Sequence, residues 1–291
     1  MDTGPLDIHL DAALDSYAVM GNPVSHSKSP RIHQAFAAQT SQPINYQAIM
    51  VALDKFEPAV MAFRDAGGKG LNVTVPFKQD AWKLATRRSS GAEIAGAVNT
   101  LSLAEHGVIV GDNTDGVGLI RDLEHHSVAT MDRRILILGA GGAVRGVLGP
   151  LLARKPASIV ISNRTLSRAE ALVIEQKPYA GLSACTLDQL PGVGKFDLII
   201  NAISSGLQGE LPPLPATLID EQSCCYDMVY GDREPVFVRW ARQHGAKLAL
   251  DGLGMLVEQA AESFYIWRGV RPETGPVIKM LRGSGLGTGA S

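Results

Sequence analysis

One stretch, RRILILGAGGAVRGVLGPLLAR at residues 133–154, constrains the fold more than any other. It reads as an apolar strand, a glycine turn and a helix. Gly139 would form the tight turn, and Gly141 would let the backbone approach a pyrophosphate at the helix N-terminus. Val144 stands where the strict GxGxxG motif has its third glycine. The context predicts dinucleotide binding, and the structural alternative is an ordinary tight turn.

The following strand indicates which dinucleotide. Domains that bind NAD usually end this strand with an acid that holds the ribose 2′-hydroxyl. Here the strand runs into SNRTLSR, which contains no acid but offers Asn163, Arg164, Thr165 and Arg168. Guanidinium groups bind a 2′-phosphate through charge-assisted hydrogen bonds, whereas a carboxylate repels it. The loop predicts NADP, and the alternative is an ordinary basic loop.

Strand-like and helix-like segments also alternate before residue 90, which is typical of βαβ units and a largely parallel sheet. The predicted strands are residues 16–20, 46–51 and 70–75, and the predicted helices are residues 29–39, 53–66 and 78–86, with Ser29 as an N-cap and Pro30 at the first helical position. The first half of the chain is therefore expected to be an α/β domain of its own.

The second half continues the alternation. We expect a helix at 117–124, strands at 158–165, 196–202 and 224–230, and a helix from Gly252 that returns to the first domain. The predicted fold is α/β, with an N-terminal α/β substrate domain and a Rossmann-type doubly wound domain. The predicted boundaries are 1–114 (1–15 a flexible extension), 115–251 for the dinucleotide domain, and 252–291 for the C-terminal segment (283–291 a disordered tail).

Composition narrows the class of protein. The formal charge of 291 residues is −2, so no basic field favours nucleic acid or an anionic membrane. Cys185, Cys224 and Cys225 form a poor disulfide framework and indicate a reducing cytoplasm. No apolar run approaches the ~18 residues of a membrane span, and no metal-ligand motif occurs. We expect a cytoplasmic protein without a metal, monomeric or homodimeric, that acts on a small molecule.

Three stretches gather polar side chains where predicted elements end: GNPVSHSKSP (21–30), LNVTVPFK (71–78) and GDNTDG (111–116). A lysine at a helix start, such as Lys78, faces the positive end of the dipole and suits proton exchange when partly buried. GDNTDG offers Asp112 and Asp115 at the junction of the two halves, where substrates commonly bind. Each stretch also has a purely structural interpretation as a turn, a cap or a surface residue.

Nine stretches then occur in one order between about residues 17 and 267: GNPVSHSKSPRIH, NVTVPFK, GAVNT, GDNTDG, GAGGAVRG, NRTLSRA, NAISSG, YDMVY and DGLGMLVEQAAESF. In these the chain resembles the shikimate dehydrogenases. The resemblance implies reversible reduction of 3-dehydroshikimate to shikimate by NADPH, in the biosynthesis of chorismate and the aromatic amino acids. It also implies a substrate domain, a Rossmann domain and a returning C-terminal helix.

The resemblance also assigns residues. It implies that Lys78 is the catalytic residue and Asp115 its partner, and that Ser27 and Ser29 bind the substrate carboxylate. The other implied substrate contacts are Thr74, Asn99, Tyr230 and Gln259. The implied cofactor contacts are Gly139, Ala140, Gly141, Gly142, Ala143, Asn163, Arg164, Thr165, Arg168, Ala202, Met228, Gly252 and Met255.

Other interpretations stay open. Ile203 stands where the family often has threonine, beside the expected cofactor edge. His26 is either a proton relay or a structural imidazole. Some members of the family oxidise quinate or use NAD. A catalytically silent NADP-binding sensor would need the glycine turn but not the Lys78–Asp115 pair.

Overall fold

The computed structural model describes residues 13–176, 179–203, 211–231 and 233–283. Most of the expected N-terminal extension (1–12) and C-terminal tail (284–291) lies outside these ranges. The chain divides into two compact units, residues 1–118 with 257–291, and residues 119–256. The second unit is therefore inserted into the first.

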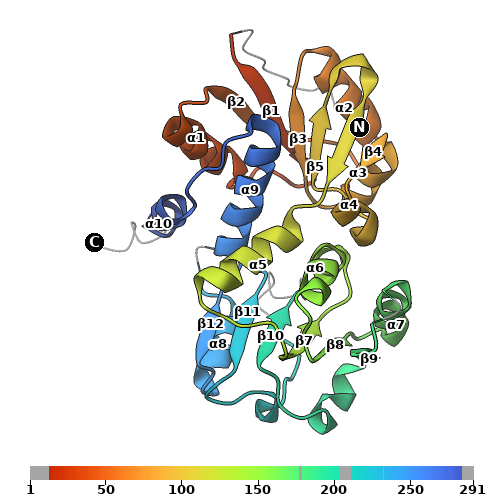
Figure 1. The fold of residues 1–291 in the computed structure, drawn as a ribbon, viewed down its shortest axis with the longest axis vertical. Coiled ribbons are helices and arrows are strands. Elements are labelled where there is room, and N and C mark those ends of the chain that lie inside the picture. The colour runs from red at the N-terminus through yellow and green to blue at the C-terminus, as the bar shows by residue number, and fades with distance from the viewer. Residues whose placement is uncertain (1–12, 177–178, 204–210, 232, 284–291) are drawn as a thin grey trace. The chain divides into compact units, whose positions relative to one another are not determined.

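The first unit contains a six-stranded sheet (Figure 1). Its strands are β1 (Asp15–Gly21), β2 (Ile44–Met50), β3 (Gly70–Val73), β4 (Arg87–Arg88), β5 (Thr100–Leu103) and β6 (Ile109–Asp112), in the order β2-β1-β3-β5-β6-β4. β1 is parallel to both β2 and β3, as the βαβ pattern predicts. β5 is antiparallel to both β3 and β6. β4 is parallel to β6, so the sheet is largely parallel, as predicted. β5 and β6 are joined only by residues 104–108, which is too short for a parallel crossover.

The helices of this unit follow the predicted ones closely. They are α1 (Ser29–Thr40), α2 (Phe56–Asp65), α3 (Lys78–Leu84), α4 (Ser90–Ala95) and α10 (Gly275–Gly283). The N-cap of α1 is Lys28, not Ser29 as the sequence predicts, and no side chain caps this end. Lys28 already has helical backbone angles, which moves Ser29 into the first turn and frees its hydroxyl from capping.

Two helices begin in one unit and end in the other: α5 (Asp115–His125) and α9 (Leu253–Arg268). The second half of α9 packs on the first sheet. Trp267 Nε1 donates to the carbonyl of Leu101 at 3.1 Å, and a Cβ on Gly70 would lie 2.6 Å from the same indole nitrogen. Arg268 donates to Gln42 Oε1 at 2.7 Å and also pairs with Asp15. The predicted return of the C-terminal helix to the first unit is confirmed.

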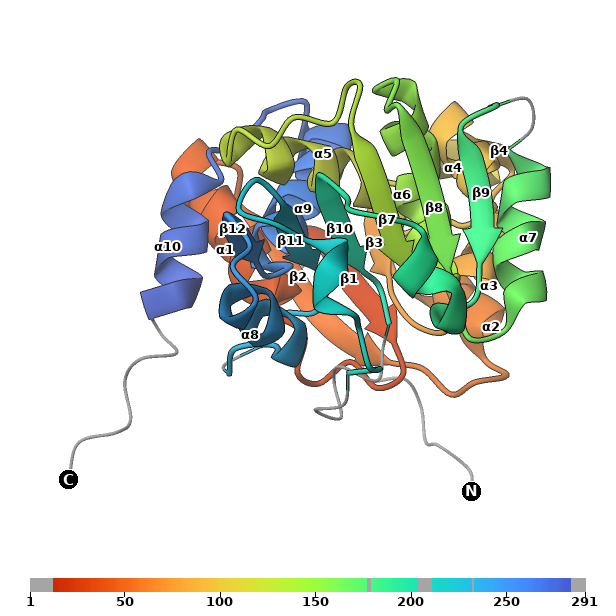
Figure 2. The ribbon, with the colours of Figure 1, turned by 90° about the horizontal axis from the view of Figure 1, so that it is seen from below.

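The second unit contains a fully parallel sheet, seen with its strands side by side in Figure 2. Its strands are β7 (Arg134–Leu138), β8 (Ser158–Ser162), β9 (Leu182–Cys185), β10 (Leu198–Asn201), β11 (Cys224–Asp227) and β12 (Leu248–Leu250), and its helices are α6 (Gly142–Ala153), α7 (Leu166–Glu175) and α8 (Val236–Gln243). The order β12-β11-β10-β7-β8-β9 reverses direction at β7. This is the doubly wound Rossmann arrangement that the glycine turn predicts.

Candidate functional site

Lys78 begins α3, and its side chain reaches the first residue of α5. Its Nζ donates to Asp115 Oδ2 at 2.5 Å, and the two side chains are 23% and 9% exposed. The start of α3 is anchored by Phe77, which is fully buried and stacks on Phe56 with ring centroids 5.0 Å apart. The N–H of Val98 also donates to the Lys78 carbonyl at 2.9 Å. These contacts fix the backbone from which the Lys78 side chain extends.

Asn99 holds the other oxygen of the carboxylate. Its Nδ2 donates to Asp115 Oδ1 at 2.8 Å, while its Oδ1 accepts the N–H of Thr114 at 2.9 Å. Because a backbone N–H can only donate, the Asn99 oxygen must face Thr114 and its nitrogen must face Asp115. The carboxylate also lies at the N-terminus of α5, where the helix dipole favours negative charge. An ammonium, an amide and a helix end thus define its orientation.

Gln259 reaches the same point from α9. Its Oε1 accepts from Asn99 Nδ2 and from Thr114 Oγ1, each at 3.3 Å. The Asn99 nitrogen has two hydrogens but three acceptors in range, which are Gln259, Thr114 Oγ1 at 2.9 Å and Asp115 Oδ1. The long contact to Gln259 is the one that an incoming hydroxyl can replace. The structure thus brings together four of the predicted residues: Lys78, Asn99, Asp115 and Gln259.

Four buried polar residues that the sequence analysis does not single out surround this group: Asn72, Thr100, Thr114 and Ser263. Ser263 Oγ lies 2.7 Å from Thr100 Oγ1 and 3.3 Å from Thr114 Oγ1, and accepts from Asn72 Nδ2 at 3.0 Å. Only Ser263 had a usable signal, since it lies one turn after Gln259 on the same helix face. Asn72, Thr100 and Thr114 lie in or beside the motifs of the family resemblance, but nothing in their spacing or residue type singles them out.

The serine-rich loop between β1 and α1 lies against the end of β3. Asn22 N–H donates to the carbonyl of Val75 at 3.0 Å, and Thr74 N–H donates to that of Met20 at 2.9 Å. A Cβ on Gly21 would lie 2.3 Å from the Thr74 side chain, so only glycine permits this approach. Thr74 is therefore next to the start of the loop that carries Ser27.

The two predicted carboxylate binders have different surroundings. Ser27 is half-buried, and its Oγ accepts the N–H of Ser29 at 3.3 Å. Ser29 is buried, and its hydroxyl is hydrogen-bonded to the phenol of Tyr46. Burial raises the pKa of Tyr46 well above its ordinary value, and the Ser29 hydrogen bond lowers it in part. His26, the possible relay, is exposed in the same loop.

In the second unit, the glycine turn lies at the switch point of the sheet. Gly139 follows β7 with φ +107°, and a Cβ there would lie 3.1 Å from the carbonyl oxygen of Ala202. Beside Gly141, the N-cap of α6, and beside Gly142, an added Cβ would meet no atom within 4 Å. Val144, which replaces the third glycine, is fully buried in the core and leaves this space open. Ala140 belongs to the same turn, and Ala143 lies in the first turn of α6.

The loop after β8 presents its cations to solvent. Asn163 Nδ2 donates to the carbonyl of Thr165 at 2.8 Å, which shapes the turn into α7. Arg164 and Arg168 are exposed, and within the part of the chain that the structure describes neither has a recorded carboxylate partner. Other arginines of this unit are paired, as Arg154 is with Glu124. Unpaired guanidinium groups and an acid-free strand end fit a 2′-phosphate.

A third part of the predicted cofactor set follows β11. Gly252 N–H donates to the carbonyl of Val229 at 3.1 Å, and a Cβ on Gly252 would lie 2.4 Å from the carbonyl oxygen of Met228. Asp227 Oδ1 accepts from Val229 N–H at 2.9 Å and from Asn201 Nδ2 at 3.2 Å. Burial raises the Asp227 pKa to about 6. These bonds fix the backbone of 228–229 against Gly252.

Two further predicted residues, Tyr230 and Met255, lie in the second unit. Burial raises the pKa of the Tyr230 phenol, which follows β11. Met255 lies at the start of α9 and is buried in the core formed by α5, α6 and the parallel sheet. The predicted cofactor residues thus fall into three groups: residues 139–143 with Ala202, residues 163–168, and Met228 with Gly252 and Met255.

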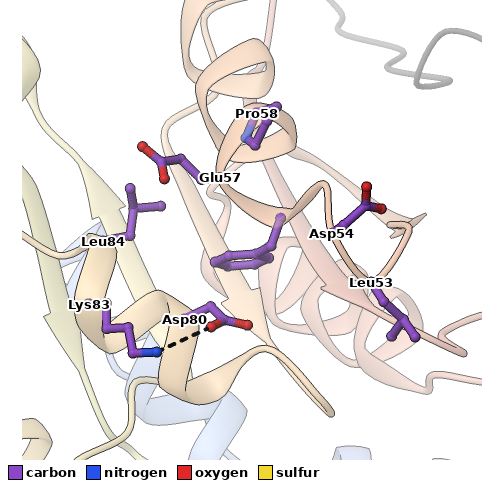
Figure 3. Close-up of a pocket in the computed structure, with 8 residues that line it drawn as sticks. Leu53, Asp54, Glu57, Pro58, Asp80, Lys83 and Leu84 are labelled. Atoms are coloured by element: carbon purple, nitrogen blue, oxygen red, sulfur yellow. Dashed lines mark ion pairs between the residues drawn. The ribbon is translucent and has the colours of Figure 1, made fainter.

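A separate hollow of about 560 Å³ lies on the surface between α2 and α3 (Figure 3). It is lined by Leu53, Asp54, Phe56, Glu57, Pro58, Asp80, Lys83 and Leu84. Lys83 lies 4.0 Å from Asp80, an exposed pair on one face of α3. None of the predicted site residues lines this hollow.

Residues 13–176, 179–203, 211–231 and 233–283 lack two features. Among these residues, no group of three or more His, Cys, Asp or Glu side chains is placed to hold a metal ion. No helix there has the length and apolar character needed to cross a membrane.

Family profiles match most of the chain. The profile of the shikimate dehydrogenase substrate binding domain matches residues 19–101, that of shikimate / quinate 5-dehydrogenase residues 122–208, and that of the shikimate 5′-dehydrogenase C-terminal domain residues 252–282. The shikimate dehydrogenase (NADP(+)) of Alkalilimnicola ehrlichii is 62% identical over 92% of this chain and 98% of its own length. That of Marinobacter nauticus is 54% identical over 92% and 98%.

Solved structures share the fold. The Ael1 enzyme of Pseudomonas putida is 47% identical, with a TM-score of 0.86 over 92% of this chain and 98% of that one. Shikimate 5-dehydrogenase from Thermus thermophilus, in complex with NADP(H) and shikimate, is 32% identical, with a TM-score of 0.83 over 94% and 100%.

Proposed function

The chain belongs to the NADP-dependent shikimate dehydrogenases, and from this membership we propose which residues carry out its reaction. It is an oxidoreductase that reversibly reduces 3-dehydroshikimate to shikimate with NADPH, in the biosynthesis of aromatic amino acids. Hydride addition to a carbonyl carbon leaves negative charge on the oxygen, so the protein has to supply a cation and a proton at that atom.

Lys78 is the proposed catalytic residue. Its ammonium group stabilises the developing charge on the carbonyl oxygen and donates the proton to it, and in the reverse direction the amine accepts the hydroxyl proton. Asp115 orients the ammonium group and accepts a hydrogen bond from a substrate hydroxyl. Asn99 keeps the Asp115 carboxylate in place from its other oxygen.

The remaining substrate contacts are proposed by chemical type. Ser27, and Ser29 in competition with the Tyr46 phenol, offer hydroxyl donors to the carboxylate at the start of α1. Thr74 lies next to the start of the same loop. Asn99 and Gln259 offer amide groups to ring hydroxyls, and the 3.3 Å contact between them is the bond that the substrate replaces. Tyr230 is assigned to the same pocket by resemblance.

NADPH supplies the hydride when bound. We assign its pyrophosphate to the open N-terminus of α6 at residues 139–143, and its 2′-phosphate to Arg164 and Arg168, with Asn163 and Thr165 in the same loop. Ala202, Met228, Gly252 and Met255 are assigned to the nicotinamide end. The open space beside Gly141 and Gly142 supports this assignment.

The observation that carries the proposal is the 2.5 Å contact between Lys78 Nζ and Asp115 Oδ2, with Asn99 on the second carboxylate oxygen. Lys78→Met keeps the volume of the stem and removes the charge and the donors. We expect kcat to fall by on the order of 10²-fold or more, with a much smaller change in KM, because the missing interaction is strongest in the transition state.

Lys83→Met is the matched control, since Lys83 lies on the same helix and is 74% exposed. Both variants are compared with the parent by circular dichroism and by steady-state reduction of 3-dehydroshikimate. If a folded Lys78→Met protein retains activity within a few-fold of the parent, Lys78 is not the catalytic group. The same assay run backwards, with shikimate or quinate and with NADP⁺ or NAD⁺, defines the breadth of substrate and cofactor use.

Location and assembly are also proposals. The three cysteines are free and buried, which supports a reducing cytoplasm. We propose a monomer or a homodimer, which sedimentation at several protein concentrations distinguishes.

A further inference from the structure

A buried phenol, that of Tyr46, is connected to Asn99 through the side chain of Asn72. The Oη of Tyr46, on β2, donates to Asn72 Oδ1 on β3 at 2.8 Å. Asn72 Nδ2 in turn lies 3.3 Å from the Asn99 carbonyl and 3.0 Å from Ser263 Oγ. Tyr46 and Asn72 are only 4% and 6% exposed, so water does not compete for these bonds.

The direction of each bond in this chain is fixed by chemistry. The Asn99 carbonyl can only accept, so the amide nitrogen of Asn72 must face it and the amide oxygen must face Tyr46. The phenol must then donate to Asn72. On its other side the phenol can only accept, and Ser29 supplies that hydrogen bond. A single ordered chain therefore runs from Ser29 through Tyr46 and Asn72 to Asn99.

The phenol is also held by its ring. His33, which is fully buried on α1, stacks on it with centroids 4.2 Å apart and planes 6° apart, and Trp267 lies 6.5 Å away. A ring confined in this way gives the hydroxyl one position. The positions of its two hydrogen-bond partners, Asn72 and Ser29, are therefore also fixed.

We propose that Tyr46 and Asn72 are positioning residues for the reaction, because their buried hydrogen-bond chain fixes at once Ser29, at the carboxylate end of the substrate, and Asn99, which orients the Asp115 carboxylate. Neither residue touches substrate. The inference rests on the proposed roles of Ser29, Asn99 and Asp115, and it extends the active site to the strands β2 and β3.

The direct test removes only the phenol oxygen. Tyr46→Phe keeps the stacking on His33 but leaves Asn72 Oδ1 buried without a donor. Tyr17→Phe is the matched control. Tyr17, on β1, is paired in register with Tyr46 and stacks on Trp267. Its hydroxyl accepts from Arg268 and takes no part in the hydrogen-bond chain of Tyr46 and Asn72.

For Tyr46→Phe we expect kcat/KM for shikimate to fall roughly 10-fold, through both a higher KM and a lower kcat. The KM for NADP⁺ should stay unchanged, because the chain ends only in residues assigned to the substrate. Calorimetric titration of the cofactor-free protein with shikimate should show the same weakening. Tyr17→Phe should match the parent in all three measurements.

If Tyr46 has a purely structural role, Tyr46→Phe should have a lower melting temperature but unchanged kinetic constants in the folded protein. That result would overturn the proposal. So would an equal loss in Tyr17→Phe. If Tyr46→Phe does not fold, Ser263→Ala removes a second acceptor that holds the Asn72 amide nitrogen, and it must show the same selective loss for shikimate. Lys78→Met distinguishes this proposal from the proposed catalytic role. If Lys78→Met is inactive while Tyr46→Phe has the kinetic constants of the parent, only the positioning role is rejected.

Discussion

At Ser29, one hydroxyl proton has two possible acceptors. The Tyr46 phenol accepts it within the protein, and the carboxylate of a bound substrate would compete for it. Ser27 has no such commitment, because its Oγ accepts the N–H of Ser29 and keeps its own proton for a ligand. Of the two serines, Ser27 is therefore the better donor to a carboxylate.

Replacing Ser27 with Ala should accordingly weaken substrate binding without affecting the chemical step. A hydrogen bond to a charged group contributes roughly 1.5–3 kcal/mol, so the KM for shikimate should rise about 10- to 100-fold while kcat changes little. Ser25→Ala, in the exposed part of the same loop, is the control. An unchanged KM in steady-state kinetics would reduce the loop to a structural turn.

Single residues were predictable where a motif gives each a function of its own. The pairing of Lys78 with Asp115, and the approach of Asn99 and Gln259, were predicted from the family resemblance and appear in the structure, although their roles stay predictions. Asn72 could not be predicted, because its contact with Ser263 joins positions 191 residues apart. The capping role of Ser29 was wrong because backbone angles, not residue type, decide where a helix begins.

Among the elements, the loop between β8 and α7 is the one that we propose to determine cofactor choice. Arg164 and Arg168 are exposed, and within the described ranges no carboxylate pairs with either. The strand before them ends without the acid that would repel a 2′-phosphate. The two guanidinium groups are therefore available to a ligand.

Replacing both arginines with alanine should weaken NADPH far more than NADH, since only NADPH carries the 2′-phosphate. Each charge-assisted contact contributes roughly 1.5–3 kcal/mol. Arg154→Ala removes a paired arginine of the same unit and should change neither KM. Equal losses for the two cofactors in steady-state kinetics would show that the loop does not select between them.

Element by element, the second unit was the more predictable. The strands β7, β8, β10 and β11 are largely buried, each is followed by a polar or glycine-containing loop, and all four were predicted. The short β9 and β12 are less buried and were not predicted. The antiparallel β5 and β6 were not predicted, because they are four residues each and carry no long apolar run. Short strands depend on tertiary pairing, which local patterns do not show.

For the whole molecule, the buried His33 links stability to pH. Among the described residues, neither ring nitrogen has a partner within hydrogen-bond geometry. Burial lowers the His33 pKa from 6.5 to about 3, and the neighbouring Asn72 side chain offsets only part of this shift. In the unfolded chain, His33 therefore becomes protonated below pH 6.5. In the folded protein it becomes protonated only near pH 3. The stability due to neutral His33 is complete above pH 6.5 and decreases as the pH falls through that window.

This predicts a measurable slope. Between pH 6 and 4, the unfolding free energy of the parent should fall more steeply than that of His33→Gln, by about 1.4 kcal/mol per pH unit. Urea titrations at several pH values measure it, with His26→Gln, an exposed histidine, as the control. Parallel curves for parent and His33→Gln would mean that His33 is protonated in the folded state.

The insertion of one unit into the other also sets the order in which a growing chain can be completed. The second unit is continuous in sequence, whereas the first needs residues from 257 onward. Asn99 and Gln259, whose side chains meet in the site, are made 160 residues apart. At about 5–20 residues per second, translation takes on the order of 8–30 s to cover that distance. The N-terminal strands are therefore synthesised well before α9, which packs on them. The first unit is begun first during translation but is completed last.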